Sequence, residues 1–472
     1  MNLFPEESKD MEKSLARDTV GTTLTNVALF LLGILIWIAT ARFLQPTWRG
    51  ALALIMIMPA IVMRAGTLGF DQGIVVIGSS DRGKLAPLLR SSVLFGFIMG
   101  LLAIAILLGF MWGFPKIFWK VTQVWLPGPF LVISLAFPLH LMTMAYDAAI
   151  YAEDRIAERN LKELWVNAVM LFIIVASFFA FKLQLYGVIG AYIVANALSL
   201  VYGWLLVRNR LDLAGGISIP LLKDAIKIGF PVYLAQLASF IMLPIMMVIL
   251  SAVLPGDAHE NLARIAFFTM GYQMIERVLP VTRSTAFALL PKITTGSEET
   301  AGKLAAKVSR HTLIASLILF SLLILLVHPI VIILLGRRYL PVAGSFCLMS
   351  PGGVALSVAS VWSSHLLARH RSLEVAKGGV GGVITALLVT ALGFSTLPEG
   401  REVFTASLAV MLGSLVNAAF LFFAFRNATG LTACEILLPA IDDVKEWHRI
   451  PSLVKAHIFR RRVNKEEVKL IR

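Results

Sequence analysis

Five ionisable residues stand inside two otherwise apolar stretches of this chain. Arg64 and Asp71 lie in the first stretch, and Glu276, Arg277 and Arg283 lie in the second. A charged side chain at the centre of a bilayer costs at least about 2.5–3.5 kcal/mol, so each should face other protein or a water-filled cavity. The three arginines could then bind a diphosphate or an acidic sugar through charge-assisted hydrogen bonds. The carboxylates could act as gates or proton carriers.

The spacing of these residues repeats between the two stretches. Arg64 and Asp71 are seven residues apart, as are Glu276 and Arg283, and an offset of 212 residues superimposes one pair on the other. Seven residues make two helical turns, about 10 Å, so each pair should share a helix face. We therefore predict that Arg64, Arg277 and Arg283 bind substrate, and that Asp71 and Arg283 form a gate between two halves of the molecule. In the alternative interpretation, each arginine pairs within its own half and only holds helices together.

Asp147 and His140 form a further candidate pair, two turns apart on one predicted helix. Histidine changes its charge near neutral pH, so the two residues could relay protons. We assign Asp147, together with Asp71 and Glu276, to gating or ion coupling. His140 can equally be a structural residue whose hydrogen bonds are satisfied.

Motifs for other kinds of chemistry are absent from the sequence. It contains no phosphate-binding loop, nucleotide fingerprint, zinc-ligand spacing or Ser/His/Asp set. We therefore predict neither an enzyme nor a metal or cofactor site. Its only two cysteines, Cys347 and Cys434, do not suit a disulfide framework.

These residues must be positioned by membrane-spanning helices. The chain has 472 residues, of which 58% are hydrophobic and 15% charged, whereas soluble domains are about 45–50% apolar and about 25% charged. Apolar runs of the roughly 20 residues that cross a bilayer recur along the sequence. They predict an all-α polytopic membrane protein with about twelve transmembrane helices, near residues 20–41, 50–77, 87–113, 126–152, 161–181, 185–207, 224–254, 260–290, 308–335, 341–368, 373–394 and 402–425.

An internal repeat divides the chain into two pseudo-symmetric lobes of six helices. Leu126-Pro127 and Leu340-Pro341 begin corresponding helices 214 residues apart. Because each half has six helices, the halves share one orientation and are related by an axis along the membrane normal. The predicted segments are a cytoplasmic N-terminal segment (1–19), an N-lobe (20–208), a cytoplasmic linker (209–223), a C-lobe (224–427) and a basic, amphipathic cytoplasmic tail (428–472).

The distribution of charge predicts the orientation. A net charge of +14 would suggest a nucleic-acid partner for a soluble protein, but here the lysines and arginines gather in alternate loops. About three times as many fall on the side that carries both termini, which predicts that both termini are cytoplasmic. The tail contains Arg460-Arg461-Arg462 and either lies on anionic lipid as an amphipathic helix or stays loosely ordered.

Short motifs along the chain resemble those of one family. Residues 41–50 read Ala-Arg-Phe-Leu-Gln-Pro-Thr-Trp-Arg-Gly. This run is similar to the A-R-x-L-G-P-x-x-x-G turn of bacterial polysaccharide flippases, the Wzx-like branch of the multidrug/oligosaccharidyl-lipid/polysaccharide (MOP) exporter superfamily. The family's L-G-L, G-x-x-Y and L-x-A-x-G-R motifs resemble Leu68-Gly69-Phe70, Gly336-Arg337-Arg338-Tyr339 and Leu366-Leu367-Ala368-Arg369-His370-Arg371. Gln45 and His370 depart from the pattern, in which glycine is usual.

The resemblance implies a fold and a cargo. It implies a V-shaped, MATE-like pair of six-helix lobes that alternate access, with helices 1, 2, 7 and 8 lining the cavity between them. The implied cargo is an undecaprenyl-diphosphate-linked oligosaccharide, a repeat unit of a surface polysaccharide, turned from the cytoplasmic to the periplasmic leaflet of the bacterial inner membrane. The expected partners are this lipid-linked substrate, the lipid bilayer and the polysaccharide polymerase machinery, but no nucleic acid, and the protein itself is expected to be a monomer.

Four other functions remain as alternatives. A drug exporter of the same superfamily would favour carboxylates for its cationic cargo, and a lipid II flippase would share the central arginines but usually has more helices. A membrane glycosyltransferase or polymerase typically carries catalytic residues on a long periplasmic loop, and every outside loop here is short. A structural scaffold would leave the charges inside the membrane unexplained.

Overall fold

The computed structural model describes residues 25–113, 127–211, 215–295, 298–396, 398 and 400–439. Every regular element in these ranges is a helix. The N-terminal half contains a first helix (Thr25–Phe43), α2 (Pro46–Gly66), α3 (Phe70–Ser80), α4 (Arg82–Gly113), α6 (Pro127–Ser134), α7 (Ala136–Ala152), α8 (Ile156–Phe179) and α9 (Gln184–Arg208). The C-terminal half contains α10 (Ile219–Phe240), α11 (Met242–Val253), α12 (Ala258–Thr295), α13 (Glu298–Leu334), the 3-10 helix η1 (Arg337–Tyr339), α14 (Val342–Ala368), α15 (Ser372–Thr396), α16 (Glu402–Thr429) and α17 (Ala433–Leu437).

The helices of the described part agree with a polytopic membrane protein. Eleven segments are long and apolar enough to cross a membrane, with α10 and α11 counted together. A further helix, α12, carries Glu276 and Arg277 and is not among the eleven, but its 38 residues span about 57 Å at 1.5 Å per residue. It packs against α2, α11, α13, α14 and α16. The predicted fold, an all-α membrane protein of about twelve transmembrane helices in two lobes, is confirmed.

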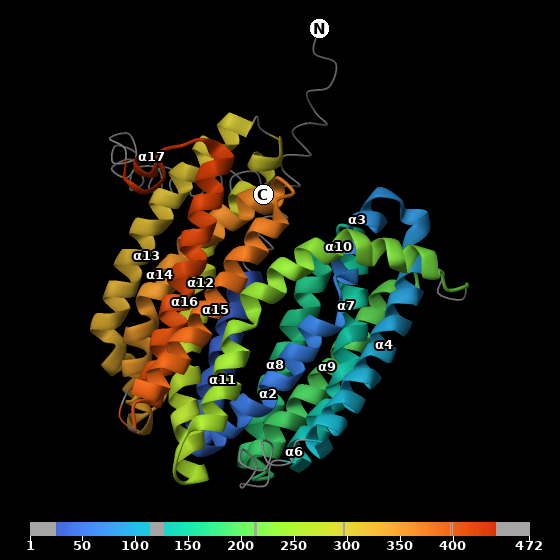
Figure 1. The fold of residues 1–472 in the computed structure, drawn as a ribbon. Coiled ribbons are helices and arrows are strands. Elements are labelled where there is room, and N and C mark those ends of the chain that lie inside the picture. Colours follow the sequence, from blue (N-terminus) through green and yellow to red (C-terminus); the bar gives the residue numbers. More distant parts are fainter. Residues whose placement is uncertain are drawn as a thin grey trace, which may run out of the picture.

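The two lobes meet at one end. In the N-terminal lobe α7 packs against α4, α8 and α9, and in the C-terminal lobe α14 packs against α12, α13 and α16. Figure 1 shows the lobes converging where the first helix passes into α2, and diverging toward the opposite end. We call the converging end, with residues 43–50, 254–262 and 334–340, the closed end. The arrangement is the V shape that the resemblance implies.

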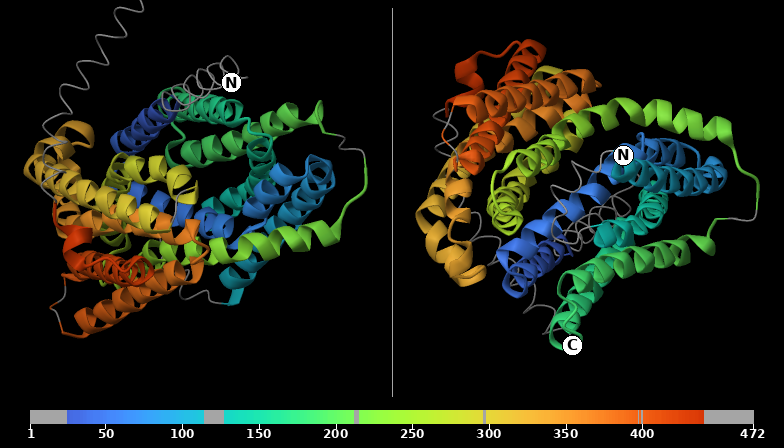
Figure 2. Two further views of the ribbon diagram at one scale, coloured as in Figure 1. Left: turned by 90° about the horizontal axis from the view of Figure 1, so that it is seen from above. Right: turned by 60° about the horizontal axis from the view of Figure 1, so that its bottom comes forward.

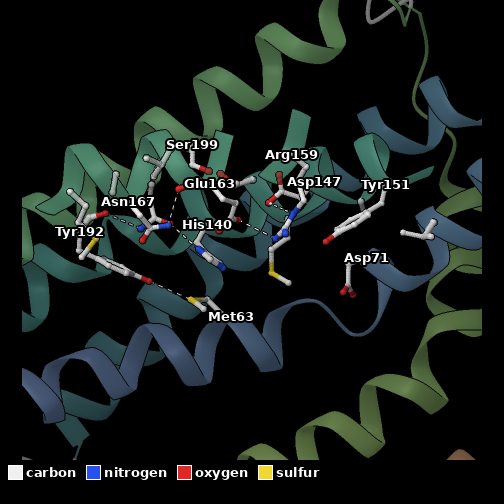
Figure 3. Close-up of a pocket in the computed structure, with 18 of the residues that line it drawn as sticks. Met63, Asp71, His140, Asp147, Tyr151, Arg159, Glu163, Asn167, Tyr192 and Ser199 are labelled. Atoms are coloured by element: carbon white, nitrogen blue, oxygen red, sulfur yellow. Dashed lines mark hydrogen bonds and ion pairs between the residues drawn. The ribbon is translucent and has the colours of Figure 1, made fainter. Parts of the chain in front are cut away.

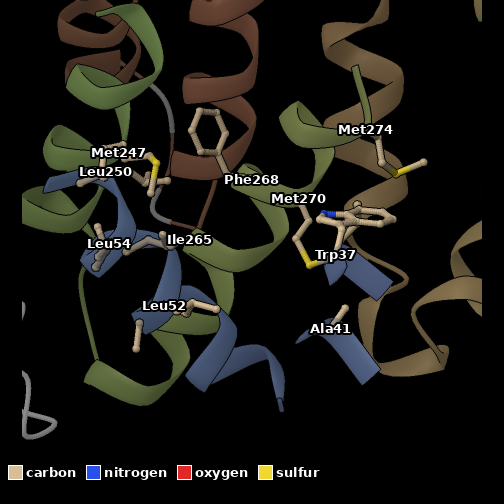
Figure 4. Close-up of a cluster of buried hydrophobic side chains, with 14 of the residues drawn as sticks. Trp37, Ala41, Leu52, Leu54, Met247, Leu250, Ile265, Phe268, Met270 and Met274 are labelled. Carbon is tan, nitrogen blue, oxygen red and sulfur yellow. The ribbon is translucent and has the colours of Figure 1, made fainter. Parts of the chain in front are cut away.

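Apolar side chains fill the contact between the lobes at the closed end (Figure 4). The first helix and α2 contribute one side, and α11 and α12 contribute the other: Trp37, Ala41, Leu52 and Leu54 face Met247, Leu250, Ile265, Phe268, Met270 and Met274. The helices approach closely, because a Cβ on Gly50 would lie 1.8 Å from the Leu262 carbonyl oxygen. Small residues that permit such close packing are the usual means of joining helices in a membrane.

The second transmembrane segment is broken, where the sequence predicts one continuous helix over 50–77. Three residues separate α2 from α3. Among them, Leu68 (φ 46°) and Gly69 (φ 86°) adopt left-handed backbone conformations, which glycine tolerates because it has no Cβ. A Cβ on Gly229 of α10 would lie 1.9 Å from the Gly69 carbonyl oxygen, so the break also forms a close contact with α10.

Helix α10 crosses from one lobe to the other, as Figure 2 shows. Its first half packs on α3 and α4, and its second half packs on α15. Ile241 separates α10 from α11, whereas the sequence predicts one helix over 224–254. The helix begins at Ile219, inside the predicted linker 209–223. Because it contacts both lobes, α10 can respond to a change in their separation.

Candidate functional site

Arg64 lies between the lobes, in the last turn of α2. Its side chain is exposed, and its guanidinium donates a hydrogen bond to Gln236 Oε1 on α10, 2.9 Å away. The ring of Phe240, four residues further along α10, has its centroid 5.8 Å from the guanidinium carbon. The sequence places Arg64 in the middle of a helix, but in the structure it stands beside the break between α2 and α3. Its exposed guanidinium is available to an anionic ligand.

Arg277 occupies the centre of α12 and contacts the first helix. Its guanidinium carbon lies 5.5 Å from the centroid of the Trp37 ring, a cation–π contact. Arg277 Nε is buried and has no hydrogen-bond partner among the described residues. Glu276, the preceding residue, is exposed. The contacts of Arg64 and Arg277 each join the two halves of the chain, so both arginines lie at the junction of the lobes.

A buried polar cluster lies next to Arg277, toward the closed end. Gln273 Oε1 accepts hydrogen bonds from Trp37 Nε1 and from Arg49 Nη2, each 2.9 Å long. Arg49 is 6% exposed, although its charge would place it in a loop outside the membrane. Gln273 and Arg277 are one turn apart on α12 and share a face. Sequence reasoning missed this cluster, and its only signal was the position of Arg49 in the family-like run 41–50.

Two of the family-like motifs contact each other at the closed end. Arg42 donates hydrogen bonds to the carbonyl oxygens of Leu334, 3.0 Å from Nε, and of Ile333. These carbonyl groups lie at the end of α13 and have no hydrogen-bond partner within the helix. The guanidinium of Arg42 therefore caps the helix, and its positive charge is stabilised by the negative end of the helix dipole. The hydroxyl of Tyr339 donates to the Leu44 carbonyl oxygen, 2.8 Å away and 295 positions earlier. The motifs therefore hold the lobes together at this end.

A cavity of about 420 Å³ lies inside the N-terminal lobe, between α2–α3 and α7–α9. We call it the N-lobe cavity. Figure 3 shows Met63 and Asp71 on one side of it, opposite His140 and Asp147. Its other polar lining residues are Gln72, Thr143, Tyr151, Arg159, Glu163, Asn167, Tyr192, Asn196 and Ser199. The cavity thus brings together Asp71, His140 and Asp147, which the sequence analysis singled out on two separate helices.

Asp147 belongs to a cluster of ion pairs in the wall of this cavity. Lys162 Nζ pairs with Asp147 Oδ1, and Arg159 Nε lies 4.0 Å from Asp147 Oδ2. Arg159 Nη2 also lies 3.1 Å from Glu163 Oε1, and its guanidinium carbon lies 4.9 Å from the Tyr151 ring centroid. The Lys162 side chain is completely buried. These pairs join α7 to α8, which gives Asp147 a structural partner that the sequence analysis did not identify.

His140 is bonded to a neutral amide rather than to Asp147. Its Nδ1 lies 2.8 Å from Asn196 Oδ1, and Asn196 Nδ2 donates to the Tyr192 carbonyl oxygen, also 2.8 Å away. The amide is therefore fixed in orientation by the backbone of α9. This geometry fits the structural interpretation of His140, and the proton relay stays a prediction.

The predicted gate involves a side chain that lies outside the described residues, that of Arg283. Its proposed partner, Asp71, accepts a hydrogen bond from Gln72 Nε2, 3.1 Å away. The premise that Arg64 and Asp71 share a helix face is wrong, because the helix breaks at 67–69. Arg64 contacts α10, whereas Asp71 lines the N-lobe cavity. The gate itself stays a prediction.

The groups gathered at the lobe junction and in the cavity are guanidinium, amide, carboxylate and aromatic side chains. Among the described residues, no three His, Cys, Asp or Glu side chains come together in a way that could hold a metal ion. The free cysteines, Cys347 and Cys434, lie in α14 and α17. The chemistry that this arrangement offers is binding through charge and hydrogen bonds.

Comparison with known proteins identifies a family. A family model described as polysaccharide biosynthesis protein matches residues 15–297, which is more than half of the chain. No curated protein matches the chain.

Solved structures with a similar fold cover most of the chain. A multidrug resistance MATE family transporter of the MOP superfamily, in an inward-facing conformation, is 15% identical with a TM-score of 0.66, over 85% of this chain and 94% of that one. The lipid II flippase MurJ, in an inward closed conformation, is 14% identical with a TM-score of 0.67, over 86% and 89%. A MOP superfamily transporter from Pyrococcus furiosus is 14% identical with a TM-score of 0.60, over 89% and 97%. At such low sequence identity, the TM-scores and coverages show a shared fold.

Proposed function

The chain belongs to the polysaccharide biosynthesis protein family, and on that basis we propose that it is a flippase for a polyprenyl-diphosphate-linked oligosaccharide. Family and fold together point to a flippase or exporter in a membrane. The observation that supports this cargo best is the position of Arg64 and Arg277 at the junction of the lobes. A diphosphate is the part of the cargo that two guanidinium groups would bind most strongly.

In the proposed site, a phosphate of the cargo replaces Gln236 as the hydrogen-bond partner of Arg64. In the structure Arg64 donates to Gln236, a neutral amide on α10. A hydrogen bond from a guanidinium to a phosphate joins two opposite charges and is stronger than one to a neutral amide. Cargo would therefore displace Gln236 and release a link between α2 and α10. Binding that favours one arrangement of the lobes over the other is what a ligand needs in order to shift their equilibrium.

The proposed cycle is alternating access between the two leaflets. The lobes pack together at the closed end and diverge at the other, so the observed state would receive cargo from the diverging end (Figure 1). We infer from the excess of lysine and arginine on the side of the termini that this end faces the cytoplasm, and we propose the inner membrane of a bacterium as the location. In this scheme Arg283 joins the phosphate site, while Asp71, Glu276 and Asp147 contribute to gating or ion coupling. The protein would act as a monomer that delivers its cargo to a polysaccharide polymerase.

Flipping of lipid II is the second candidate, because the fold is similar to that of a lipid II flippase and both cargoes carry a lipid diphosphate. Export of cationic drugs is less suited to a junction that carries two arginines. The test is deletion of the gene in its native host, followed by analysis of lipid-linked glycans in the cytoplasmic leaflet. We expect the repeat unit of a surface polysaccharide to accumulate there and to disappear on complementation. Accumulation of lipid II, or of no lipid-linked glycan, would contradict the proposal.

A further inference from the structure

The N-lobe cavity is a second site, distinct from the arginines at the lobe junction. Its volume of about 420 Å³ falls within the roughly 300–1,000 Å³ of small-molecule binding sites. Twelve of its nineteen lining residues carry polar or charged side chains, set among apolar ones. A cavity with this lining suits a ligand that carries many hydroxyl groups.

The charges around the cavity leave one carboxylate without a compensating cation. Asp147 is paired with Lys162 and lies near Arg159, which also pairs with Glu163. Asp71 accepts a hydrogen bond from a glutamine and has no ion-pair partner among the described residues. The wall is therefore mildly acidic. It should favour a neutral or amino-bearing ligand and disfavour a carboxylate, because like charges repel at short range.

The polar groups are spread around the wall and do not converge on one point. Asp71 and Tyr192 lie on opposite flanks of the cavity, with His140 between them (Figure 3). Among the described residues no three His, Cys, Asp or Glu side chains form a cluster that could hold a metal ion. Dispersed donors and acceptors match the hydroxyl groups around a sugar ring better than they match a single cation.

The last turn of α2 contributes residues both to the cavity and to the lobe junction. Met63 lines the cavity, where its sulfur accepts a hydrogen bond from the Tyr192 hydroxyl at 3.4 Å. The next residue, Arg64, contacts α10 at the junction. Successive helical residues project about 100° apart, so the two sites open on adjacent faces of the end of α2. One molecule could place a diphosphate at Arg64 and its attached sugars in the cavity.

We propose that the N-lobe cavity binds the sugars next to the diphosphate of the cargo, and that it selects neutral or amino sugars over uronic acids. The inference rests on the proposed function for the identity of the cargo. In this proposal two sites recognise the cargo. The arginines at the junction bind the phosphates, and the cavity, with Asp71 in its wall, binds the sugars and selects among them.

The test measures binding of separate probes to the purified full-length protein. The sugar probes are a neutral N-acetylglucosamine disaccharide, a glucosamine disaccharide and digalacturonate, and the phosphate probe is farnesyl diphosphate. Ser199→Phe fills the cavity from α9, and its matched control, Leu198→Phe, adds the same ring at an exposed neighbouring position. Asp71→Asn removes the uncompensated charge.

We expect the neutral or the amino disaccharide to bind at least tenfold more tightly than digalacturonate, about the effect of one charge-assisted contact. Ser199→Phe should weaken binding of the neutral or amino disaccharide about tenfold, whereas Leu198→Phe should not. Asp71→Asn should reduce the difference in affinity between these disaccharides and digalacturonate. The inference is overturned if no disaccharide binds, if digalacturonate binds as tightly as the others, or if the two phenylalanine variants behave alike.

The phosphate probe separates this inference from the proposed function. Farnesyl diphosphate should bind the wild type and Ser199→Phe equally and should bind Arg64→Ala more weakly. If it does so while the disaccharides fail, the cavity inference is wrong and the phosphate site stands. If farnesyl diphosphate does not bind at all, the proposed cargo is wrong. Binding of the disaccharides then still shows which sugars the cavity accepts.

Discussion

The guanidinium of Arg64 donates a hydrogen bond to the side-chain amide of Gln236, 2.9 Å away on a helix that contacts both lobes. On the other side of the junction, Arg277 lies over the ring of Trp37. Each arginine is thus held by a neutral partner from the other half of the chain. A neutral amide does not neutralise the guanidinium of Arg64, so a phosphate can replace Gln236 there and gain a contact between opposite charges.

Removal of the Tyr339 hydroxyl should weaken the closed end. Tyr339→Phe keeps the buried ring but deprives the Leu44 carbonyl oxygen of its donor. We expect the free energy of unfolding to fall by about 1 kcal/mol, the usual net value of one hydrogen bond. Thermal denaturation of the purified protein measures the change. Tyr202→Phe is the control, because the described residues give that hydroxyl no hydrogen bond, and equal melting of both variants would contradict the prediction.

A larger residue at position 50 should separate the lobes. A Cβ at Gly50 would already overlap the Leu262 carbonyl oxygen, so Gly50→Val requires α2 and α12 to move apart. Cysteines at Thr47 and His259, which contact each other at the closed end, report on the separation through disulfide formation once the native cysteines are replaced. We expect cross-linking to fall sharply in Gly50→Val. It should persist in Gly109→Val, where the added side chain meets no neighbouring atom, and undiminished cross-linking in Gly50→Val would disprove the packing argument.

Removing the charge of Asp147 alone should destabilise the protein more than removing both charges of the Lys162–Asp147 pair. Asp147→Asn leaves the completely buried charge of Lys162 without its partner, and we expect it to cost about 3 kcal/mol of unfolding free energy. Lys162→Met should cost less, because Asp147 is partly exposed and still lies 4.0 Å from Arg159. The double variant should recover much of this loss, which a double-mutant cycle measures. If the stable double variant still transports, Asp147 is structural. If it folds but no longer transports, the predicted coupling role of Asp147 gains support.

The gate predicted between Asp71 and Arg283 is tested by exchanging the charges. If the two side chains pair when the diverging end closes, Asp71→Arg and Arg283→Asp should each abolish export, because like charges then face each other. The double exchange should restore part of the activity. Surface glycan, measured at matched protein abundance, is the readout. No recovery in the double variant would remove the support for direct pairing.

The sequence predicts the helices well and their tertiary partners poorly. Apolar length identifies a membrane span whatever it packs against, and charge in the middle of a span locates Arg277 at the junction. The break at Gly69 escapes hydropathy, because three residues of turn do not interrupt an apolar run. It nevertheless redirects Arg64 and Asp71 to different surroundings, so a spacing argument that assumes a continuous helix fails there.

Partners that come from distant segments leave little trace in the sequence. Lys162 reads as a loop charge beside other loop charges, yet it is buried against Asp147 because α8 begins where α7 turns back. Arg49 likewise reads as an outside charge, and only Gln273, 224 positions away, explains its burial. The family-like motifs gave a better indication, since Tyr339 and Leu44 belong to two of them and are bonded to each other.

The central claim, that the junction arginines carry a lipid diphosphate across the membrane, is tested most directly in proteoliposomes. The measurement is transfer of a fluorescent polyprenyl-diphosphate oligosaccharide between leaflets by the wild type, Arg64→Ala, Arg277→Ala and the control Arg208→Ala, whose side chain stacks on Trp204 at the end of α9. Loss of one charge-assisted hydrogen bond costs roughly 1.5–3 kcal/mol, so we expect transfer to slow by about tenfold or more in each junction variant. The control should transfer at the wild-type rate. Equal transfer by all four proteins, or none by the wild type, would contradict the account.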